Sequence, residues 1–371
     1  MLVEKKADVF VVGGGPAGLA AGIAAARKGF TVTVADGTEP PIDKPCGEGM
    51  MPETRAALSE LGVELPEGIG WKFRGIRFVQ EEWRIEAKFP SGEGIGVPRP
   101  VLHQRLIEEA EKCGVTCLWK TPVRGIEGGK VSVNGGAVRA RWIIGADGGA
   151  SRVRKWVDLD DSTGRTQRMA ARRRYRVRPW CEYVEVYWTK NTQVYVTPIG
   201  REEVCIVTMG DSAEDVKFER VLQDLPSLRT RISNAEVAGR ERGVVTAMHR
   251  LRRVTRGNVA LVGDASGGVD AITGEGLRLA FRQAGALAEA ISKGDLREYQ
   301  EVHRQLQKRP LWMGKLMLEL GRREKVRERV LRTMNEHEGL FAKALAIHVG
   351  RATPRDTIAT MAEFGWRLLA A

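Results

Sequence analysis

The chain has 371 residues, a formal net charge of +12, and 43% hydrophobic and 29% charged residues. These values are typical of a globular protein of one or two domains and exclude a disordered, collagen-like or disulfide-rich chain. The five cysteines include no CxxC pair, so we expect buried, reduced thiols and no metal site.

The uncharged segment 9–26 is long enough to resemble a membrane span or a signal peptide. Its glycines and its proline, however, stand in the order of a nucleotide-binding turn. No other segment resembles a membrane span, so the sequence predicts a soluble, cytoplasmic protein.

The first predicted strand, 9–12, and the first predicted helix, 19–27, flank the run Gly13-Gly14-Gly15-Pro16-Ala17-Gly18. Gly13 permits a tight turn, Gly15 lets the backbone approach a diphosphate, and Gly18 lets the helix pack closely on the strand. The free N–H groups and the dipole of the helix N-terminus favour a negative charge there. This pattern predicts a βαβ dinucleotide-binding unit. The alternative is a βαβ unit whose glycines serve packing only.

A carboxylate supports the nucleotide interpretation. The next predicted strand, 31–35, ends at Asp36, eighteen residues after Gly18. This spacing is close to that of an acidic residue that accepts hydrogen bonds from a ribose.

The remaining elements follow in chain order. We expect a short helix over 52–61, alternating strands over 71–97, a helix over 98–114, and strands over 115–119, 123–126, 130–133 and 138–144. A second glycine-rich segment, 145–154, follows these strands. Residues 166–254 are mostly β with one helix over 216–225. A third glycine-rich segment, 262–276, lies between a strand over 258–262 and a helix over 277–291, and residues 297–371 are helical and amphipathic.

The three segments together resemble those of the flavoprotein superfamily that contains para-hydroxybenzoate hydroxylase-type monooxygenases, flavin-dependent halogenases and geranylgeranyl reductases. The resemblance covers residues 7–295. Its matching positions are Gly13, Gly15 and Gly18 with Asp36; Asp147, Gly148, Ser151 and Arg154; and Gly263 with Asp264.

The resemblance implies an α/β fold, with a Rossmann-like FAD-binding domain of the glutathione reductase type interrupted by an antiparallel β-sheet substrate domain. The expected FAD-binding domain comprises 1–75, 98–165 and 255–296, and the expected substrate domain comprises 76–97 and 166–254. A helical C-terminal region, 297–371, completes the chain.

The resemblance also implies a non-covalently bound FAD. Asp264 would hydrogen-bond the ribityl chain, Arg105 would approach the diphosphate, and Val123 would lie near the adenine. The turn before helix 277–291 would present its N–H groups to the flavin, where a helix N-terminus stabilises the charge of the reduced ring. The expected cofactor-binding residues are Gly13, Gly15, Pro16, Ala17, Gly18, Asp36, Lys44, Cys46, Gly47, Arg105, Val123, Asp147, Gly263, Asp264, Gly274, Gly276 and Leu277.

No single branch of the superfamily matches throughout. The run Lys44-Pro45-Cys46-Gly47-Glu48-Gly49 resembles the Cys-Gly loop of geranylgeranyl reductases, but 194–198 replaces their YxWxFP signature. The WxWxIP motif of tryptophan halogenases is absent, and so are the prolines that hydroxylases carry after Gly-Asp. Cys46 and Tyr195 are the candidates beside the flavin, although Cys46 is equally consistent with a small buried residue in a turn.

We expect an FAD-dependent oxidoreductase. The first hypothesis is a monooxygenase that is reduced by transiently bound NAD(P)H and hydroxylates an aromatic or polyketide-like apolar substrate, because the sequence has no second GxGxxG and no Ser-His-Asp or metal set. The alternative is a geranylgeranyl-reductase-like enzyme that reduces prenyl or lipid double bonds, followed by a halogenase. A non-catalytic flavin sensor is the alternative from a different class.

Positive charge is concentrated in two segments. Seven arginines and no acidic residue occur over 165–178, and ten basic against three acidic residues occur over 304–332, interleaved with apolar side chains. No nucleic-acid-binding motif accompanies them. We therefore expect attraction to an anionic membrane surface or an acidic carrier, with a solvated basic helix as the structural alternative. His103, His249 and His348 are expected to be isolated and structural.

Overall fold

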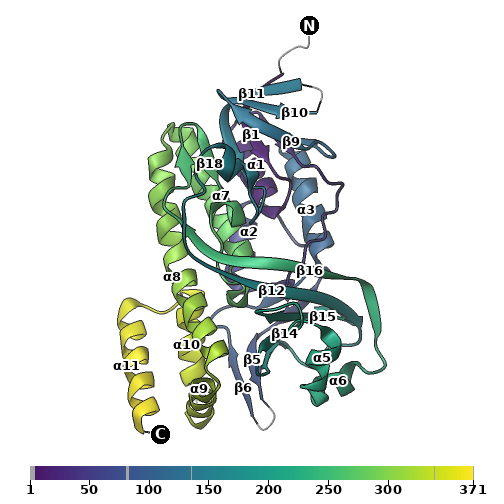
Figure 1. Cartoon of the computed structure of the whole chain (residues 1–371), viewed down its shortest axis with the longest axis vertical. Coiled ribbons are helices and arrows are strands. Elements are labelled where there is room, and N and C mark those ends of the chain that lie inside the picture. Colours follow the sequence, from purple (N-terminus) through teal and green to yellow (C-terminus); the bar gives the residue numbers. More distant parts are fainter. Residues whose placement is uncertain (1–4, 81–82, 135, 338, 371) are drawn as a thin grey trace.

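The computed structural model describes residues 5–80, 83–134, 136–337 and 339–370. Figure 1 shows an α/β unit at one end, a second sheet at the other end, and long helices along one side. The predicted mixed α/β class, with a βαβ unit, a second sheet and a helical C-terminal region, is confirmed.

The first sheet has the strand order β17-β18-β11-β1-β2-β8, and β9 and β10 extend it beside β11. Its central strands are parallel, and Val9, Phe10 and Val11 are fully buried because α1 (Pro16–Arg27), α3 (Arg99–Lys112) and α7 (Gly276–Lys293) pack around the sheet. The strands are β1 (Lys5–Val12), β2 (Val32–Ala35), β8 (Thr116–Leu118), β9 (Val123–Glu127), β10 (Lys130–Val133), β11 (Gly136–Gly145), β17 (Thr255–Arg256) and β18 (Val259–Leu261).

The second sheet has the order β16-β12-β15-β14-β13-β5-β6. All its pairings are antiparallel except that of β13 with β5. Its strands are β5 (Gly75–Val79), β6 (Arg84–Lys88), β12 (Ser162–Arg176), β13 (Tyr183–Trp188), β14 (Thr192–Gly200), β15 (Glu203–Gly210) and β16 (Glu236–Leu251). How these sheets divide into domains stays a prediction.

One local expectation was wrong. The region 216–225 was expected to contain the one helix of the β-rich segment, but α5 (Phe218–Gln223) is followed by α6 (Pro226–Ile232), because Pro226 suits the first turn of a second helix. The strands expected over 71–97 are present and pair antiparallel, but in two sheets. β7 (Gly94–Gly96) pairs with β3 (Gly49–Met50) and β4 (Trp71–Phe73) in a separate small sheet, while β5 and β6 join the second sheet.

The alternation of side chains gives the second sheet two different faces. Tyr187, Val194 and Val196 pack against α5 and α6. Val186, Trp188 and Tyr195 lie on the opposite face, toward the C-terminal helices. The face that can approach a cofactor therefore carries Tyr195 rather than Tyr183 or Tyr187.

The described residues of the predicted helical C-terminal region form four helices. They are α8 (Leu296–Arg322), α9 (Glu324–Glu336), α10 (Leu340–Val349) and α11 (Pro354–Ala370). The remaining helices are α2 (Pro52–Glu60) and the short α4 (Arg152–Trp156), with 3₁₀ turns at Gly263–Ser266 and Ala271–Thr273. Among the described residues, no helix combines the length and apolarity that crossing a bilayer requires.

Candidate flavin site

The first glycine-rich turn packs against the second segment. Gly13 has a φ of +109°, and a Cβ on it would lie 2.5 Å from the carbonyl oxygen of Ala146. A Cβ on Gly18 would lie 1.8 Å from the carbonyl oxygen of Gly13. Only glycine fits these two positions, so the close packing of turn, helix and strand that the sequence predicts is present.

The third segment packs on the start of α1. Gly263 has a φ of +60°, and a Cβ there would lie 2.6 Å from the Cβ of Ala17. Three segments separated by more than a hundred residues along the chain thus meet at the N-terminus of one helix.

Arg154 connects the second and third segments. Its side chain is almost fully buried; Nη2 donates to Gly149 O at 2.8 Å, Nη1 to Ala265 O at 3.2 Å, and Nε to Asp160 at 2.8 Å. A buried guanidinium with this many acceptors holds both loops in one arrangement.

The backbone around this point fits a dinucleotide. A Cβ on any of Gly15, Gly47, Gly149 or Gly276 would meet nothing within 4 Å, so each of these glycines leaves its backbone open to a ligand. Gly15 precedes Pro16 at the start of α1, and no acidic side chain occupies the first turn of that helix. N–H groups at a helix N-terminus suit a diphosphate. The side chain of Asp264 is exposed and can accept hydrogen bonds from sugar hydroxyls.

The other two acidic residues of the predicted site, Asp36 and Asp147, accept hydrogen bonds from groups of the protein itself. One oxygen of Asp36 accepts from Gly14 N at 2.7 Å, and the other accepts from Thr38 N and Oγ1. Asp147 accepts from Ser151 Oγ, Arg152 N and Val153 N, so it holds the start of α4. The structure therefore places both carboxylates at the turns. Their direct contact with the cofactor stays a prediction.

The flanking predicted residues differ in placement. Lys44 Nζ lies 3.7 Å from the position of a Cβ on Gly148, beside the second segment. Val123 is buried at the start of β9. Arg105 Nη1 instead donates to Glu108 of its own helix at 2.7 Å. Gly274 has a left-handed backbone and Gly276 begins α7, while Leu277 packs on the core.

The histidines are not isolated, contrary to expectation. His103 is fully buried; its Nε2 donates to Gly14 O at 2.7 Å, and its Nδ1 accepts from Ile42 N at 3.2 Å. His348 Nε2 donates to Thr273 O at 3.0 Å, and His249 contacts Arg154. His303, which the sequence did not single out, bonds Ser266 Oγ at 2.8 Å. Burial lowers the pKa of His103 and His348, and that of His303 to about 4, so all three hold the loops as neutral imidazoles.

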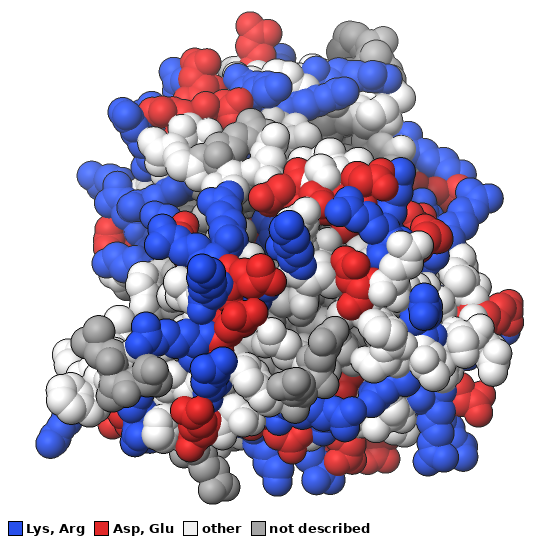
Figure 2. Space-filling model, turned by 60° about the horizontal axis from the view of Figure 1, so that its bottom comes forward, with Lys and Arg blue, Asp and Glu red and all other residues white. Residues whose placement is uncertain are grey.

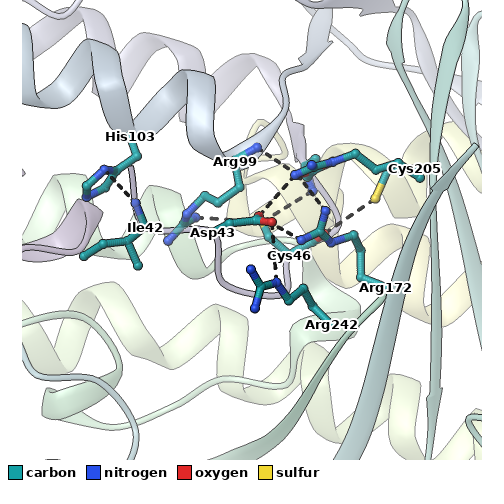
Figure 3. Close-up of polar contacts among 10 residues, drawn as sticks. Ile42, Asp43, Cys46, Arg99, His103, Arg172, Cys205 and Arg242 are labelled. Atoms are coloured by element: carbon teal, nitrogen blue, oxygen red, sulfur yellow. Dashed lines mark hydrogen bonds and ion pairs between the residues drawn. The ribbon is translucent and has the colours of Figure 1, made fainter. Parts of the chain in front are cut away.

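The loop that carries Cys46 is fixed by a buried ion cluster, which Figure 3 shows between the loop and β12. Asp43 accepts from Arg172 at 2.8 Å and from Arg174 at 3.2 Å, and Glu48 pairs with Arg174 and accepts from Arg99 N at 2.8 Å. The side chain of Glu48 is 0% exposed and that of Arg172 is 1% exposed. Burial raises the pKa of Asp43, but the hydrogen bond from Arg172 and the charges of Arg172, Arg174 and Arg242 together outweigh burial and leave that pKa below its ordinary value.

The arginine-rich segment is therefore not a basic surface patch. Besides Arg172 and Arg174, Arg168 is buried and donates to Gln193 at 2.9 Å, and it pairs with Asp270. Arg173 points to the other face of β12, where it pairs with Glu219 and Glu241. Arg168, Arg172 and Arg174 thus connect the second sheet to the loops of the nucleotide unit.

Cys46 and Tyr195 both lie near the ion cluster. Cys46 is in the loop that contacts β15, and Tyr195 is on β14 of the second sheet. The Cys46 thiol accepts from Glu48 N at 3.3 Å, and the backbone oxygen of Cys46 accepts from Cys205 Sγ at 3.6 Å. Tyr195 is on β14, and burial strongly raises the pKa of its hydroxyl, which has no hydrogen-bond partner among the described residues. Arg168 and Arg172 lie on the same face of β12. That face contacts the Cys46 loop through Asp43 and the third glycine-rich segment through Asp270.

A comparison with known protein families tests the expectation that the cofactor is FAD. Residues 6–294 match the family of the FAD binding domain. The chain belongs to this family. FAD is therefore the cofactor, and the chain is an FAD-dependent oxidoreductase. Within the described residues, no group of side chains could hold a metal ion.

Relatives with assigned activities cover most of this flavoprotein. A menaquinone reductase of Mycobacterium tuberculosis (strain ATCC 25618 / H37Rv) is 29% identical over 323 residues, which is 80% of this chain and 79% of the relative. A digeranylgeranylglycerophospholipid reductase of Methanothrix thermoacetophila is 27% identical over 318 residues, covering 78% and 80%. These identities connect this chain to reductases by sequence.

Solved structures agree on the fold. A geranylgeranyl bacteriochlorophyll reductase-like protein of Thermoplasma acidophilum has a TM-score of 0.76 at 20% identity and covers 90% of this chain and 92% of its own. Halogenases and a hydroxypyridine oxygenase also align, at similar identities. The expected superfamily is confirmed, and the fold is shared by reductases, halogenases and oxygenases alike.

Proposed function

We propose that this flavoprotein is a reductase that saturates a carbon–carbon double bond in the isoprenoid chain of a lipid or quinone. This assignment favours the geranylgeranyl-reductase-like alternative over the monooxygenase. It is supported by the named reductases among the sequence relatives and by the Cys46 loop.

The observation that carries the proposal is a continuous apolar wall. It begins at Met51, whose Cε lies 3.7 Å from the position of a Cβ on Gly274, and it extends over the face of the second sheet to α9 and α10. Its members are Met51, Phe73, Phe78, Ile85, Ala87, Phe89, Val186, Leu331, Phe341, Leu345 and Val349. These side chains are buried against one another, so they border the third glycine-rich segment (262–276, here called the flavin loop) with a dry, apolar core. Such a border suits a hydrocarbon substrate, which gains free energy from every CH₂ removed from water.

The protein supplies position, a dry environment and a proton. Reduced FAD provides the hydride equivalent, and NAD(P)H is the expected source of the electrons. Tyr195 is the candidate proton donor, because its buried hydroxyl stays neutral and unpaired near Arg168 and Asp270. Asp270 also accepts from Ile272 N at 3.0 Å, which couples this polar group to the flavin loop.

The test is an anaerobic turnover with FAD-loaded protein, NADPH and a polyprenyl quinone or a geranylgeranyl lipid. The proposal expects a product that has gained two hydrogen atoms, without oxygen consumption. Oxygen-dependent addition of one oxygen atom to an aromatic substrate would instead establish the monooxygenase.

Tyr195→Phe should lower the rate of saturation by about 100-fold or more while leaving the FAD content unchanged. Tyr183→Phe is the matched control, because Tyr183 lies on the opposite face of the second sheet beside Arg77. Equal turnover of the two variants would remove Tyr195 from the proton-donating role.

A further inference from the structure

Exposed apolar side chains are concentrated at the C-terminal helices. Ten large hydrophobic residues are exposed in the described part of the chain, and six of them lie on α8, α9 and α11: Trp312, Leu316, Val326, Ile358, Met361 and Trp366. Single exposed hydrophobic residues are ordinary, but a group of this kind on adjacent helices marks an interaction surface.

The outermost helix, α11, is oriented in an unusual way. Ile358, Met361 and Trp366 are 70%, 50% and 74% exposed, and their spacing places them along one side of the helix. Ala359, Ala362 and Gly365 are the exposed residues between them, so no charge interrupts the stripe.

Two charged residues in the second half of the same helix, Glu363 and Arg367, contact other segments of the chain. Glu363 pairs with Lys343 of α10 at 2.8 Å, and Arg367 contacts His337 at 2.9 Å and Glu363 at 2.8 Å. Thr360 is buried. A helix on the surface of a protein in water normally points its apolar stripe inward. In α11 a wide apolar stripe points outward while ion pairs hold the inner side.

Positive charge accompanies these apolar side chains. Lys315, Arg322, Arg323 and Lys325 are exposed on the second half of α8 and the start of α9, around Trp312, Leu316 and Val326. The exposed acids of the same stretch are Glu319, which pairs with Arg323 at 3.0 Å, and Glu324, so the cations are in excess. Because α11 packs on α9 and α9 packs on α8, the helices form one continuous group. Figure 2, with the lower end of the molecule turned forward, shows more Lys and Arg than Asp and Glu, with uncharged areas between them.

We propose that the exposed side of α8, α9 and α11 binds the surface of an anionic lipid bilayer. Ile358, Met361 and Trp366 would enter the headgroup region, where tryptophan is favoured, and the cations of α8 and α9 would face lipid phosphates. Charge complementarity selects this partner over a second copy of the chain, which carries the same positive surface.

The surface is connected to the flavin site. α10 directly precedes α11 along the chain, and His348 of α10 donates to Thr273 O in the flavin loop. Docking α11 on a bilayer therefore brings the apolar wall and the flavin loop to the membrane. This consequence rests on the proposed reductase function, whereas the lipid binding itself does not.

The experiment measures partitioning of the FAD-loaded protein onto vesicles of phosphatidylcholine alone and of phosphatidylcholine mixed with phosphatidylglycerol. No substrate is present, so the result is independent of enzyme activity. Binding to the anionic vesicles should weaken as salt shortens the Debye length from about 30 Å at 0.01 M to about 10 Å at 0.1 M.

Two variants separate charge from insertion. Arg322→Glu with Arg323→Glu and Lys325→Glu should lower partitioning at low salt by roughly a hundredfold, on the scale of about fivefold for each basic residue near the surface. Ile358→Ser with Trp366→Ser should lower it by a similar factor of about a hundred, including at high salt.

Matched controls carry the same changes elsewhere. Arg124→Glu with Arg139→Glu and Arg141→Glu changes the net charge equally on β9 and β11, at the other end of the molecule. Val244→Ser with Val245→Ser removes exposed apolar side chains from β16. Retained FAD and unchanged circular dichroism establish folding, and these controls should bind vesicles as the parent protein does.

The proposal is overturned if the protein ignores anionic vesicles at low salt, or if the control variants lose as much binding as the surface variants. It is also overturned if light scattering shows a dimer that Ile358→Ser with Trp366→Ser splits while vesicle binding is absent. That result would assign the stripe to a second copy.

Discussion

Neutralising Glu48 tests the buried ion cluster, because this carboxylate is at its centre. In Glu48→Gln the side chain keeps its shape but loses its charge, and Arg174 and Arg172 then depend on Asp43 alone. Glu48 is 0% exposed and its arginine partners are 1% and 12% exposed, so water cannot replace the lost partner. Removing one member of such a pair costs about 3–5 kcal/mol.

This cost converts to a measurable shift in the thermal midpoint. With an unfolding entropy of about 2 cal/mol/K for each of the 371 residues, the midpoint should fall by about 4–6 °C. Differential scanning calorimetry and the temperature of flavin release report it. The loop that carries Cys46 should loosen with it, so flavin release should shift at least as far as unfolding.

Glu241→Gln is the matched control on the opposite face of β12. Glu241 pairs with Arg173 but is 45% exposed, so water screens the pair and its loss should cost about 1 kcal/mol or less. Equal shifts for Glu48→Gln and Glu241→Gln would refute the reasoning, since burial would then have no effect on the value of the ion pair.

Three further predictions concern the nucleotide loops. Asp264→Ala removes charge-assisted hydrogen bonds worth about 1.5–3 kcal/mol each and should weaken FAD binding by about 10- to 100-fold in a dialysis titration; unchanged occupancy would exclude Asp264 from the ribityl contact. Gly263→Ala places a Cβ 2.6 Å from that of Ala17 at a φ of +60°, so it should destabilise the fold and lower FAD content together. The control Gly29→Ala is also at positive φ but has open space around it, so it should affect stability only. Burial lowers the pKa of His303 to about 4, below its ordinary value of 6.5, so the unfolded chain binds the proton first as the pH falls. The contribution of His303 to stability is full above pH 6.5 and should be lost as the pH drops from 6.5 to 4. His303→Gln should reduce that slope in equilibrium unfolding.

The sequence predicted those parts of the site that depend on local pattern. The strand, the glycine turn and the helix at the start of the chain are consecutive, and the glycines at 13, 18 and 263 have the steric reasons that their motifs imply. The second helix at Pro226 was also accessible to prediction, since proline at a helix start is a local signal.

Other features depend on pairing across the chain. The arginines of β12 looked like a basic patch, because their partners Asp43, Glu48 and Asp270 lie about a hundred or more residues away. The histidines looked isolated for the same reason, since each bonds a loop from another segment. The outward apolar side of α11 was equally hidden, because periodicity defines a stripe but does not say which side faces the core.

The long strands β12 and β16 have a consequence for how this fold diversifies. Ser162 at the start of β12 is the register partner of Leu251 at the end of β16, so the chain leaves the nucleotide unit and returns to it at neighbouring points. The two ends of the segment between these residues are therefore paired strands of one sheet, and β5 and β6 join the same sheet from an earlier part of the chain. Evolution can thus exchange strands, helices and substrate-facing side chains within that segment while the three glycine-rich turns keep their places. One nucleotide unit can thereby serve reductases, halogenases and oxygenases without being rebuilt.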